Sequence, residues 1–342
     1  MKNKIKNFLK NGGLFCLLVV FTGFVLFQKG DLPAITRTLR QVKLPFLLVG
    51  IAAMIVFLLC DAKNTMTALS MFGNRVSYLS CLKYAFVGFF FSSITPSASG
   101  GQPMQIFYMH KNRIPLPHAT LTLMTELAAF QLVAVSYALA GFFFGHKLLS
   151  KTAGPIYLLL IIGVICNGFV LILILTAIFS KRAAPAIMRG VTLLLQAFRF
   201  KNADAFEKKA SELLLEYRSC AESFKHNKKT VLAILLVTCV QIAALHSVPY
   251  WVYRAFGLDS YSFFSVMALQ SILFVCVSAI PLPGAVGASE SGFILLFKTL
   301  FSPVNLTGAM LLSRGVSFYL FVFVTGLLIF FDTIFTKRCY NH

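Results

Sequence analysis

Stretches of roughly twenty apolar residues alternate along the chain with short segments rich in lysine and arginine. Runs of this length and composition are typical of helices that cross a membrane. The pattern therefore predicts an all-α, polytopic helical membrane protein in which residues 1–342 form a single integral membrane domain. About six full spans are expected, at residues 12–27, 44–60, 114–145, 152–180, 230–253 and 307–331.

Two further apolar segments contain proline and glycine and do not fit a continuous span. The first covers residues 84–109 and breaks at Pro96–Pro103. The second covers residues 260–306 and breaks at Pro281–Gly287. Proline lacks the backbone donor that a helix needs, and glycine raises the entropic cost of helix formation. In lipid, a broken helix is stable only where protein or a polar cavity surrounds it, so both segments are interpreted as re-entrant hairpins. A connecting loop outside the membrane is the alternative for the second break.

Charge sets the expected orientation. The chain has 31 lysines and arginines against 11 acidic residues, and 58% of its residues are hydrophobic. Basic segments between spans favour the cytoplasmic side, where they meet anionic lipid headgroups, so nucleic acid is not an expected partner. Segment 181–229 has apolar residues at helical spacing and is predicted to be a cytoplasmic amphipathic helical loop, with a solvated linker as the alternative.

The topology follows by counting spans from that loop. Both termini are then expected in the cytoplasm, hairpin 84–109 enters from the cytoplasmic face, and hairpin 260–306 enters from the outer face. The basic segment 28–43 conflicts with this count, because it is assigned to the outside. Opposed broken hairpins are the arrangement that inverted-repeat transporters place around a site at the membrane midplane.

Common enzyme motifs and metal sites do not match the sequence. The stretch Gly284-Ala-Val-Gly287 lacks the lysine of a phosphate-binding loop. The stretch Gly287-Ala-Ser-Glu-Ser291 is one glycine short of a nucleophile elbow, and no strand precedes it. The 8 cysteines and 6 histidines do not occur at metal-ligand spacing. No cofactor is therefore expected.

What remains is a set of polar residues at membrane depth. Arg314 is the one basic residue well inside a predicted span, and a buried acid must be paired or protonated, so Glu290 or Glu126 is its expected partner. A static ion pair that holds helices together is the alternative. Helix amino termini at the two breaks favour an anion such as a lipid phosphate. The candidate substrate-binding residues are Glu290, Arg314, Glu126, Ser97, Ser99, Gly100, Gly101, Gln102, Pro283, Gly284, Gly287 and Ser289.

Three stretches carry a family resemblance. The decapeptide Pro281-Leu-Pro-Gly-Ala-Val-Gly-Ala-Ser-Glu290 resembles the PGGxGxxE signature of the lysylphosphatidylglycerol synthase transmembrane-domain family, also called flippase-like. The arginine of Leu311-Leu-Ser-Arg-Gly315 is similar to the family's arginine in the last span. The stretch Thr95-Pro-Ser-Ala-Ser-Gly-Gly-Gln-Pro-Met104 looks like the first-hairpin motif of short, single-domain Gram-positive members. Two departures are that Ser289 and Leu127 stand where many members have arginine.

The resemblance implies a multi-pass protein of the bacterial plasma membrane that handles a phosphate-bearing lipid. In full-length members a soluble domain transfers lysine from lysyl-tRNA to phosphatidylglycerol, and here the chain stops soon after the last span. A translocase for lysyl-phosphatidylglycerol or a polyprenyl-phosphate carrier is therefore the first expectation. A phosphatidylglycerol lysyltransferase that confers resistance to cationic antimicrobial peptides, and a membrane scaffold for a separate lipid-modifying enzyme, are the alternatives. That enzyme or a second copy of the chain would be the protein partner.

Overall fold

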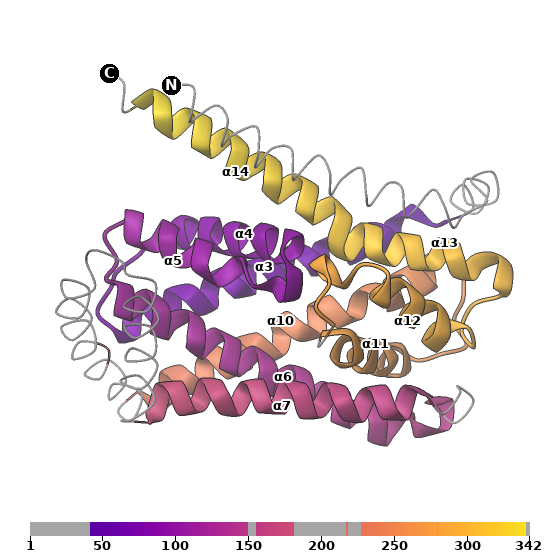
Figure 1. Ribbon diagram of the computed structural model, residues 1–342. Coiled ribbons are helices and arrows are strands. Elements are labelled where there is room, and N and C mark those ends of the chain that lie inside the picture. The colour runs from indigo at the N-terminus through magenta and orange to yellow at the C-terminus, as the bar shows by residue number, and fades with distance from the viewer. Residues whose placement is uncertain (1–41, 150–154, 181–216, 218–226, 279, 340–342) are drawn as a thin grey trace, which may run out of the picture.

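A computed structural model describes residues 42–149, 155–180, 217, 227–278 and 280–339 (Figure 1). The expected span 12–27 and nearly all of the expected loop 181–229 lie outside these residues. Every element in the described ranges is a helix, including single 3₁₀ turns at η1 and η2 and a π-helical turn at η3. In chain order the elements are α3 (Leu44–Met71), α4 (Tyr78–Ile94), η1 (Pro96–Ala98), α5 (Gly101–Lys111), α6 (Leu116–Leu149), α7 (Pro155–Phe179), α10 (Lys228–Ala255), α11 (Phe263–Ser278), η2 (Pro283–Ala285), α12 (Ala288–Phe297), α13 (Pro303–Arg314), η3 (Gly315–Tyr319) and α14 (Leu320–Cys339).

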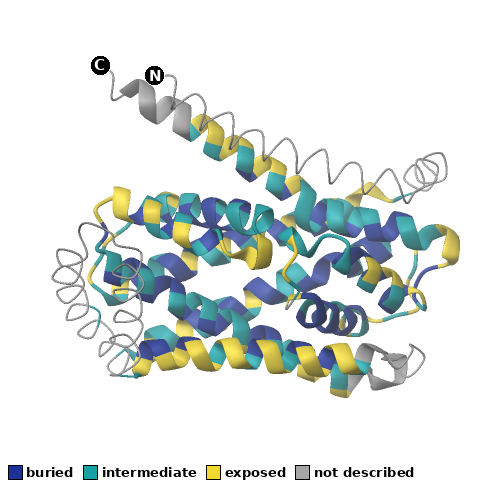
Figure 2. Ribbon diagram, viewed as in Figure 1, coloured by how far each residue is buried: buried dark blue, intermediate teal, exposed yellow. Residues whose placement is uncertain are grey.

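Helices long and apolar enough to cross a membrane occur at 5 places in the described ranges, and they confirm the spans expected there. Large apolar side chains such as Leu158, Ile161 and Phe169 are exposed along α7. Figure 2 shows exposed residues along the outer faces of α7 and α14, while buried residues lie toward the middle of the bundle. An exposed apolar face of this size is what a helix presents to lipid. The spans are Leu44–Met71, Leu116–Phe143, Tyr157–Phe179, Lys228–Ala255 and Pro303–Asp332.

One predicted boundary is wrong. The sequence prediction ended the second span at residue 60, because Asp61 and Lys63 follow, but α3 continues to Met71. The helix can continue because the Asp61 carboxylate accepts a hydrogen bond from the side chain of Gln241 on α10, at 3.0 Å. This bond from another helix replaces one of the hydrogen bonds to water that the carboxyl group would otherwise make.

The two broken hairpins are confirmed as structural units. Helices α4 and α5 form one hairpin with η1 at its tip, and α11 and α12 form the other with η2 at its tip. The hairpins enter the bundle from opposite ends, and their tips lie side by side near its middle (Figure 1). The two tips therefore meet within the bundle, as the sequence led us to expect.

The elements that lead into each hairpin repeat one another. Helices α3 and α10 both have 28 residues and pack together. Each is followed by a Phe-Gly pair whose glycine is left-handed, with φ of 75° at Gly73 and 76° at Gly257. The next helix then begins with two hydroxyls in contact, Ser77 with Ser80 at 2.9 Å and, in the other half, Ser262 with Ser265 at 2.9 Å.

The two tips have the same backbone conformation. After an extended residue and a proline, Ser97 and Ala98 have φ of 51° and 55°. The corresponding Gly284 and Ala285 have φ of 56° and 50°. Left-handed φ is uncommon outside glycine and persists where the surrounding structure enforces it. Units α3–α4–α5 and α10–α11–α12 are thus two copies of one motif that enter the bundle from opposite ends.

The largest apolar core cluster surrounds the second hairpin. Buried side chains from α10, α11, α12 and α13 contribute to it. Within it, the rings of Phe293 and Phe297 stack with centroids 4.1 Å apart. Close packing fixes the rotation of α12 about its axis, and therefore the direction in which Glu290, in its first turn, projects.

Candidate functional site

An ion pair joins the second tip to the last span. Glu290 lies in the first turn of α12, and Arg314 is the last residue of α13. The Arg314 Nε donates to Glu290 Oε1 at 3.0 Å, and an Nη2 hydrogen is donated to the Gly284 carbonyl at 2.8 Å. The Tyr319 hydroxyl also donates to Glu290 Oε1, at 2.9 Å, while the Gly287 amide donates to Oε2. Of the two partners that the sequence left open for Arg314, the structure selects Glu290.

The ion pair is mostly shielded from solvent. Its side chains are 16% exposed at Arg314 and 9% exposed at Glu290. The guanidinium lies over the ring of Phe318, 4.4 Å from the centroid. Because a buried charge loses its hydration, these contacts replace the water that the guanidinium would otherwise bind. The same contacts tie η2, α12 and η3 together.

The π-helical turn η3 follows Arg314 directly. A π turn inserts one residue into the helical register and is found frequently at functional sites. It spans Gly315–Tyr319 and ends at the tyrosine that reaches Glu290. The last span therefore changes register at the point where Arg314 and Tyr319 both meet the carboxylate.

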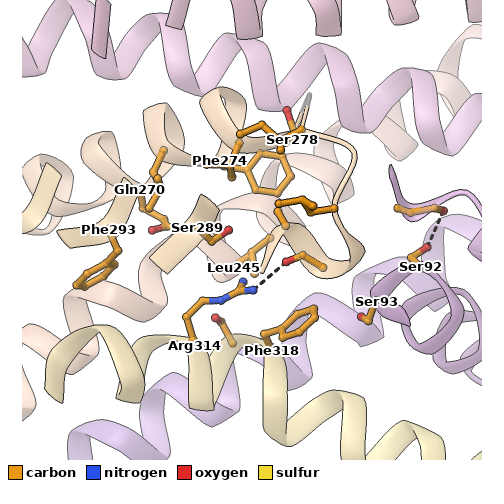
Figure 3. Close-up of a pocket in the computed structure, with 18 of the residues that line it drawn as sticks. Ser92, Ser93, Leu245, Gln270, Phe274, Ser278, Ser289, Phe293, Arg314 and Phe318 are labelled. Carbon is orange, nitrogen blue, oxygen red and sulfur yellow. Dashed lines mark hydrogen bonds between the residues drawn. The ribbon is translucent and has the colours of Figure 1, made fainter. Parts of the chain in front are cut away.

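A cavity of about 310 Å³ lies between the two tips, with Arg314 in its wall (Figure 3). Serines from both hairpins contribute polar groups, while phenylalanines and aliphatic residues from several helices line the rest. Figure 3 shows Arg314 projecting from α13 toward the η2 loop, with Ser289, Phe274 and Ser93 around the same space. The polar side chains that line the cavity are Ser92, Ser93, Ser97, Gln270, Ser278, Ser289, Ser313, Arg314 and Ser317.

Several predicted residues of the second tip are at this cavity. Arg314, Gly284 and Ser289 line it. Glu290 stands behind Arg314, and Gly287 has φ of 85° and caps the start of α12. The remaining predicted residue of this tip, Pro283, begins the η2 turn.

The first tip contributes less than predicted. Ser97 lines the cavity, whereas Ser99, Gly100, Gly101 and Gln102 are not among its lining residues. The Gly100 amide donates to the Thr95 hydroxyl at 2.8 Å, which closes the turn. Gly101 is buried against α4, where an added Cβ would meet the side chain of Ser92. The two glycines therefore allow a close approach of backbone in the hairpin.

Glu126 does not reach the cavity. It lies on α6 beside Asp61 and Thr65 of α3, separate from the Glu290–Arg314 pair. Its own neighbour Phe130, one helical turn further along α6, is the α6 residue at the cavity.

Sequence reasoning missed Tyr319, Ser313 and Ser317. All three are polar residues near Arg314 in an otherwise apolar span, which is a signal that the sequence contained. It also missed Phe57 of α3, Phe130 of α6 and Leu245 of α10, the apolar side of the cavity. Nothing in the pattern distinguishes these apolar residues from others that face lipid.

Comparison with known proteins extends these observations. The family model for the lysylphosphatidylglycerol synthase TM region matches residues 13–325. A UPF0104 membrane protein of Archaeoglobus fulgidus is 26% identical over 282 residues, which cover 79% of this chain and 81% of that protein. A second UPF0104 membrane protein, from Pyrococcus horikoshii, is 23% identical over 314 residues, or 86% of this chain and 90% of its own. This chain, with its two-tip fold and its Glu290–Arg314 pair, is thus a polytopic membrane protein of the lysylphosphatidylglycerol synthase transmembrane family.

Proposed function

We propose that this protein moves a phosphate-bearing lipid between the two leaflets of the membrane, with the lipid headgroup held in the cavity between the tips. The observation that supports this most directly is the position of Arg314. It places a cationic guanidinium in the wall of an otherwise largely apolar cavity at the meeting point of two opposed hairpins. Such a surface suits a molecule with one anionic group and apolar chains.

The guanidinium has capacity for such a ligand. Its Nε and one Nη2 hydrogen are used by Glu290 and Gly284, and no partner for Nη1 is found among the residues that the structure describes. Arginine binds phosphate through two parallel N–H bonds, and the planar fork gives this contact its direction. A phosphate that takes up Nη1 and the second Nη2 hydrogen competes with Glu290 for the positive charge.

This competition gives the pair a role beyond packing. Without a lipid, Glu290 neutralises Arg314 and holds α12 to the last span. With a phosphate at Arg314, two negative groups face one guanidinium, and the attraction between the second tip and the last span weakens. In transporters built from inverted repeats, movement of one hairpin or bundle against the other gives alternating access. Binding of the proposed substrate thus weakens the contact between the second tip and the last span, and these two parts must move apart for the substrate to cross.

Several lipids fit this description. Phosphatidylglycerol, its lysyl derivative and polyprenyl phosphates share a phosphate next to long apolar chains. The multi-pass span pattern places the protein in a membrane, and the bacterial plasma membrane with cytoplasmic termini is our proposal for which one and which orientation. Lysyl transfer from lysyl-tRNA and a scaffold role beside a separate enzyme are the competing functions.

A leaflet-resolved assay tests the proposal. The purified full chain is reconstituted into liposomes that contain fluorescent phosphatidylglycerol or its lysyl form, and a membrane-impermeant quencher reports which leaflet the lipid occupies. We expect lipid exchange with the parent protein and its loss in Arg314→Gln. Lys83→Gln is the matched control, because Lys83 forms a partly exposed ion pair with Asp332 at 2.7 Å, away from the cavity lining. A folded Arg314→Gln protein that exchanges lipid at the parent rate would refute the proposal.

Mass spectrometry separates the enzyme alternative. Lipids from a host that expresses this chain alone are compared with lipids from a host that carries an empty vector. New lysyl-phosphatidylglycerol in the first host would make lysyl transfer the primary function. An unchanged lipid profile together with exchange in liposomes supports the translocase.

A further inference from the structure

A second buried polar cluster lies between α3, α6 and α10, and the proposed lipid site does not use it. Gln241 of α10 donates to the Asp61 carboxylate at 3.0 Å. Asn64 of α3 donates through Nδ2 to the Gln241 carbonyl oxygen at 3.2 Å and to the Thr238 hydroxyl at 3.0 Å. Asn64 is 2% exposed, Gln241 2% and Thr238 1%. These bonds form one connected network that ends at a carboxylate.

A second carboxylate lies beside the first. Glu126 of α6 is near enough to Asp61 for the two charges to repel each other, and it lies beside Thr65, whose hydroxyl donates to the Asp61 carbonyl at 3.1 Å. No lysine, arginine or histidine within the described ranges pairs with either acid. The other titratable groups that face the pair are the thiols of Cys60 on α3 and Cys81 on α4. Two carboxylates this close and this far from water are not both stable as free anions.

Buried oxygens without partners occur on the pair and within one helical turn of it along α3 and α6. Within the described part of the chain, three buried oxygen atoms have no hydrogen-bond partner in this region: Oε1 of Glu126, Oδ1 of Asn64 and Oγ1 of Thr122. Thr122 is 0% exposed and lies one helical turn before Glu126 on α6. Leaving a buried polar atom unsatisfied costs about 1–3 kcal/mol, so three together call for an explanation. Oxygen acceptors around a negative pair fit a cation.

The cluster lies directly behind the lipid cavity. On each of α3, α6 and α10, a cavity-lining apolar residue lies one helical turn from a member of the polar cluster. Since one turn rises about 5.4 Å, a single apolar layer separates the two sites. Helix α3 runs opposite to α6 and α10 (Figure 1). The polar residue comes after the apolar one in the sequence of α3 and before it in the sequences of α6 and α10. All three polar residues therefore lie toward the same end of the bundle. The pairs are Phe57 and Asp61, Phe130 and Glu126, and Leu245 and Gln241.

We propose that Asp61 and Glu126 together bind one monovalent cation, either a proton or Na⁺, behind the lipid cavity. A proton is held as a single O–H shared between the two carboxyl groups. Na⁺ is held by their oxygens together with free acceptors such as Asn64 Oδ1. Either ligand adds one positive charge to a site that has two negative ones. A shared proton supplies a partner for Glu126 Oε1, whereas Na⁺ also takes up Asn64 Oδ1. This site is additional to the phosphate contact at Arg314 and does not depend on it.

The location gives the cation a consequence for the cavity. Charge at the cluster acts on a headgroup only one apolar layer away, because a low-dielectric layer screens charge weakly. Cation binding and lipid binding are therefore coupled, and coupling of this kind is reciprocal. An ion gradient across the membrane could bias lipid movement through this coupling.

Infrared difference spectroscopy of the purified full chain in detergent, without added lipid, tests the site. One series changes pH at constant salt. A second replaces choline chloride with NaCl at constant ionic strength and pH. Bound protons appear as a carboxylic acid band that is lost on deprotonation, and bound Na⁺ shifts a carboxylate band. Asp61→Asn with Glu126→Gln keeps the shape of both side chains, and Asp332→Asn, in the partly exposed Lys83 pair, is the matched control.

We expect the parent and the Asp332→Asn variant to show one of these two responses and the double variant to lack it. A response to pH alone identifies the proton, and a response to NaCl alone identifies Na⁺. A parent protein with neither response, or a response that persists unchanged in the double variant, would overturn the cation site. The absence of both responses in the parent protein would refute the site regardless of how well any variant folds. Because no lipid movement is measured, this outcome leaves the Arg314 proposal standing, and failure of the Arg314 proposal leaves the cation site standing.

Discussion

Replacing Glu290 with glutamine separates the two roles that the ion pair can have. The carboxylate accepts three hydrogen bonds, from Arg314 Nε, the Tyr319 hydroxyl and the Gly287 amide. A glutamine has one oxygen and one NH₂ group, so Glu290→Gln places a donor against another donor whichever way its amide is turned. At the same time Arg314 loses its counter-charge while its side chain stays only 16% exposed.

The expected cost can be bracketed. Breaking a buried ion pair on one side destabilises a protein by about 3–5 kcal/mol, because the remaining charge is left uncompensated. The Gly284 carbonyl and the Phe318 ring still hold the guanidinium, so we place Glu290→Gln at the lower end, about 3 kcal/mol. Replacing both partners with apolar residues of similar volume, Glu290→Leu with Arg314→Met, is expected to be neutral or to stabilise by about 1–4 kcal/mol.

Thermal unfolding in detergent and lipid exchange in liposomes are measured on both variants, with the Lys83→Gln protein as control. We expect Glu290→Gln to insert normally in the membrane, to melt at a lower temperature and to lose lipid exchange. The double variant should be at least as stable as Glu290→Gln and equally inactive. A double variant that exchanges lipid at the parent rate would show that the pair only holds helices together. A Glu290→Gln protein with parent stability would contradict the bonding pattern itself.

Three further outcomes follow from the same geometry. In a background without native cysteines, a cysteine at Asp259 should react with an impermeant reagent from outside and one at Ser97 only from inside; the reverse pattern would contradict the orientation that we propose. Gly287→Ala should lower the melting temperature by an amount equivalent to about 1–2 kcal/mol, because φ is 85° there, and an unchanged melting temperature would show that the turn relaxes. Tyr319→Phe removes the 2.9 Å bond to Glu290 and should cost about 1 kcal/mol in thermal unfolding while lipid exchange is retained at a reduced rate; complete loss would assign the hydroxyl a direct role.

Hydropathy and breaker residues determined the architecture. Apolar runs of spanning length are a local property, since each residue contributes to the free energy of transfer into lipid largely independently of its neighbours. The breaks at Pro96–Pro103 and Pro281–Gly287 are equally local, because proline and glycine limit the backbone wherever they occur. Counting spans between basic segments then placed the two hairpins on opposite faces, and the structure has them entering from opposite ends.

Partner choice was decided only by the tertiary structure. Glu290 and Glu126 are both acids at membrane depth and both fit Arg314 by composition. The rotation of α12, held by the packing of Phe293 and Phe297, turns Glu290 toward the last span. Glu126 instead faces Asp61 across α3 and α6. Which faces of two helices meet depends on the packing of the whole bundle, and no single segment contains that information.

The same reason explains the other differences. Asp61 looked like the end of a span because a charge next to an apolar run normally meets water, yet Gln241 from a distant part of the chain donates a hydrogen bond to it and α3 continues. The repeated hairpin unit is visible in the left-handed residues of the two tips, which share only a proline, an alanine and a glycine when residues 95–101 are aligned with 282–288. Spans and breaks can be predicted from each segment of the chain separately. The site forms only where the two tips and the last span pack together, because its buried charges are stable only beside partners from other segments.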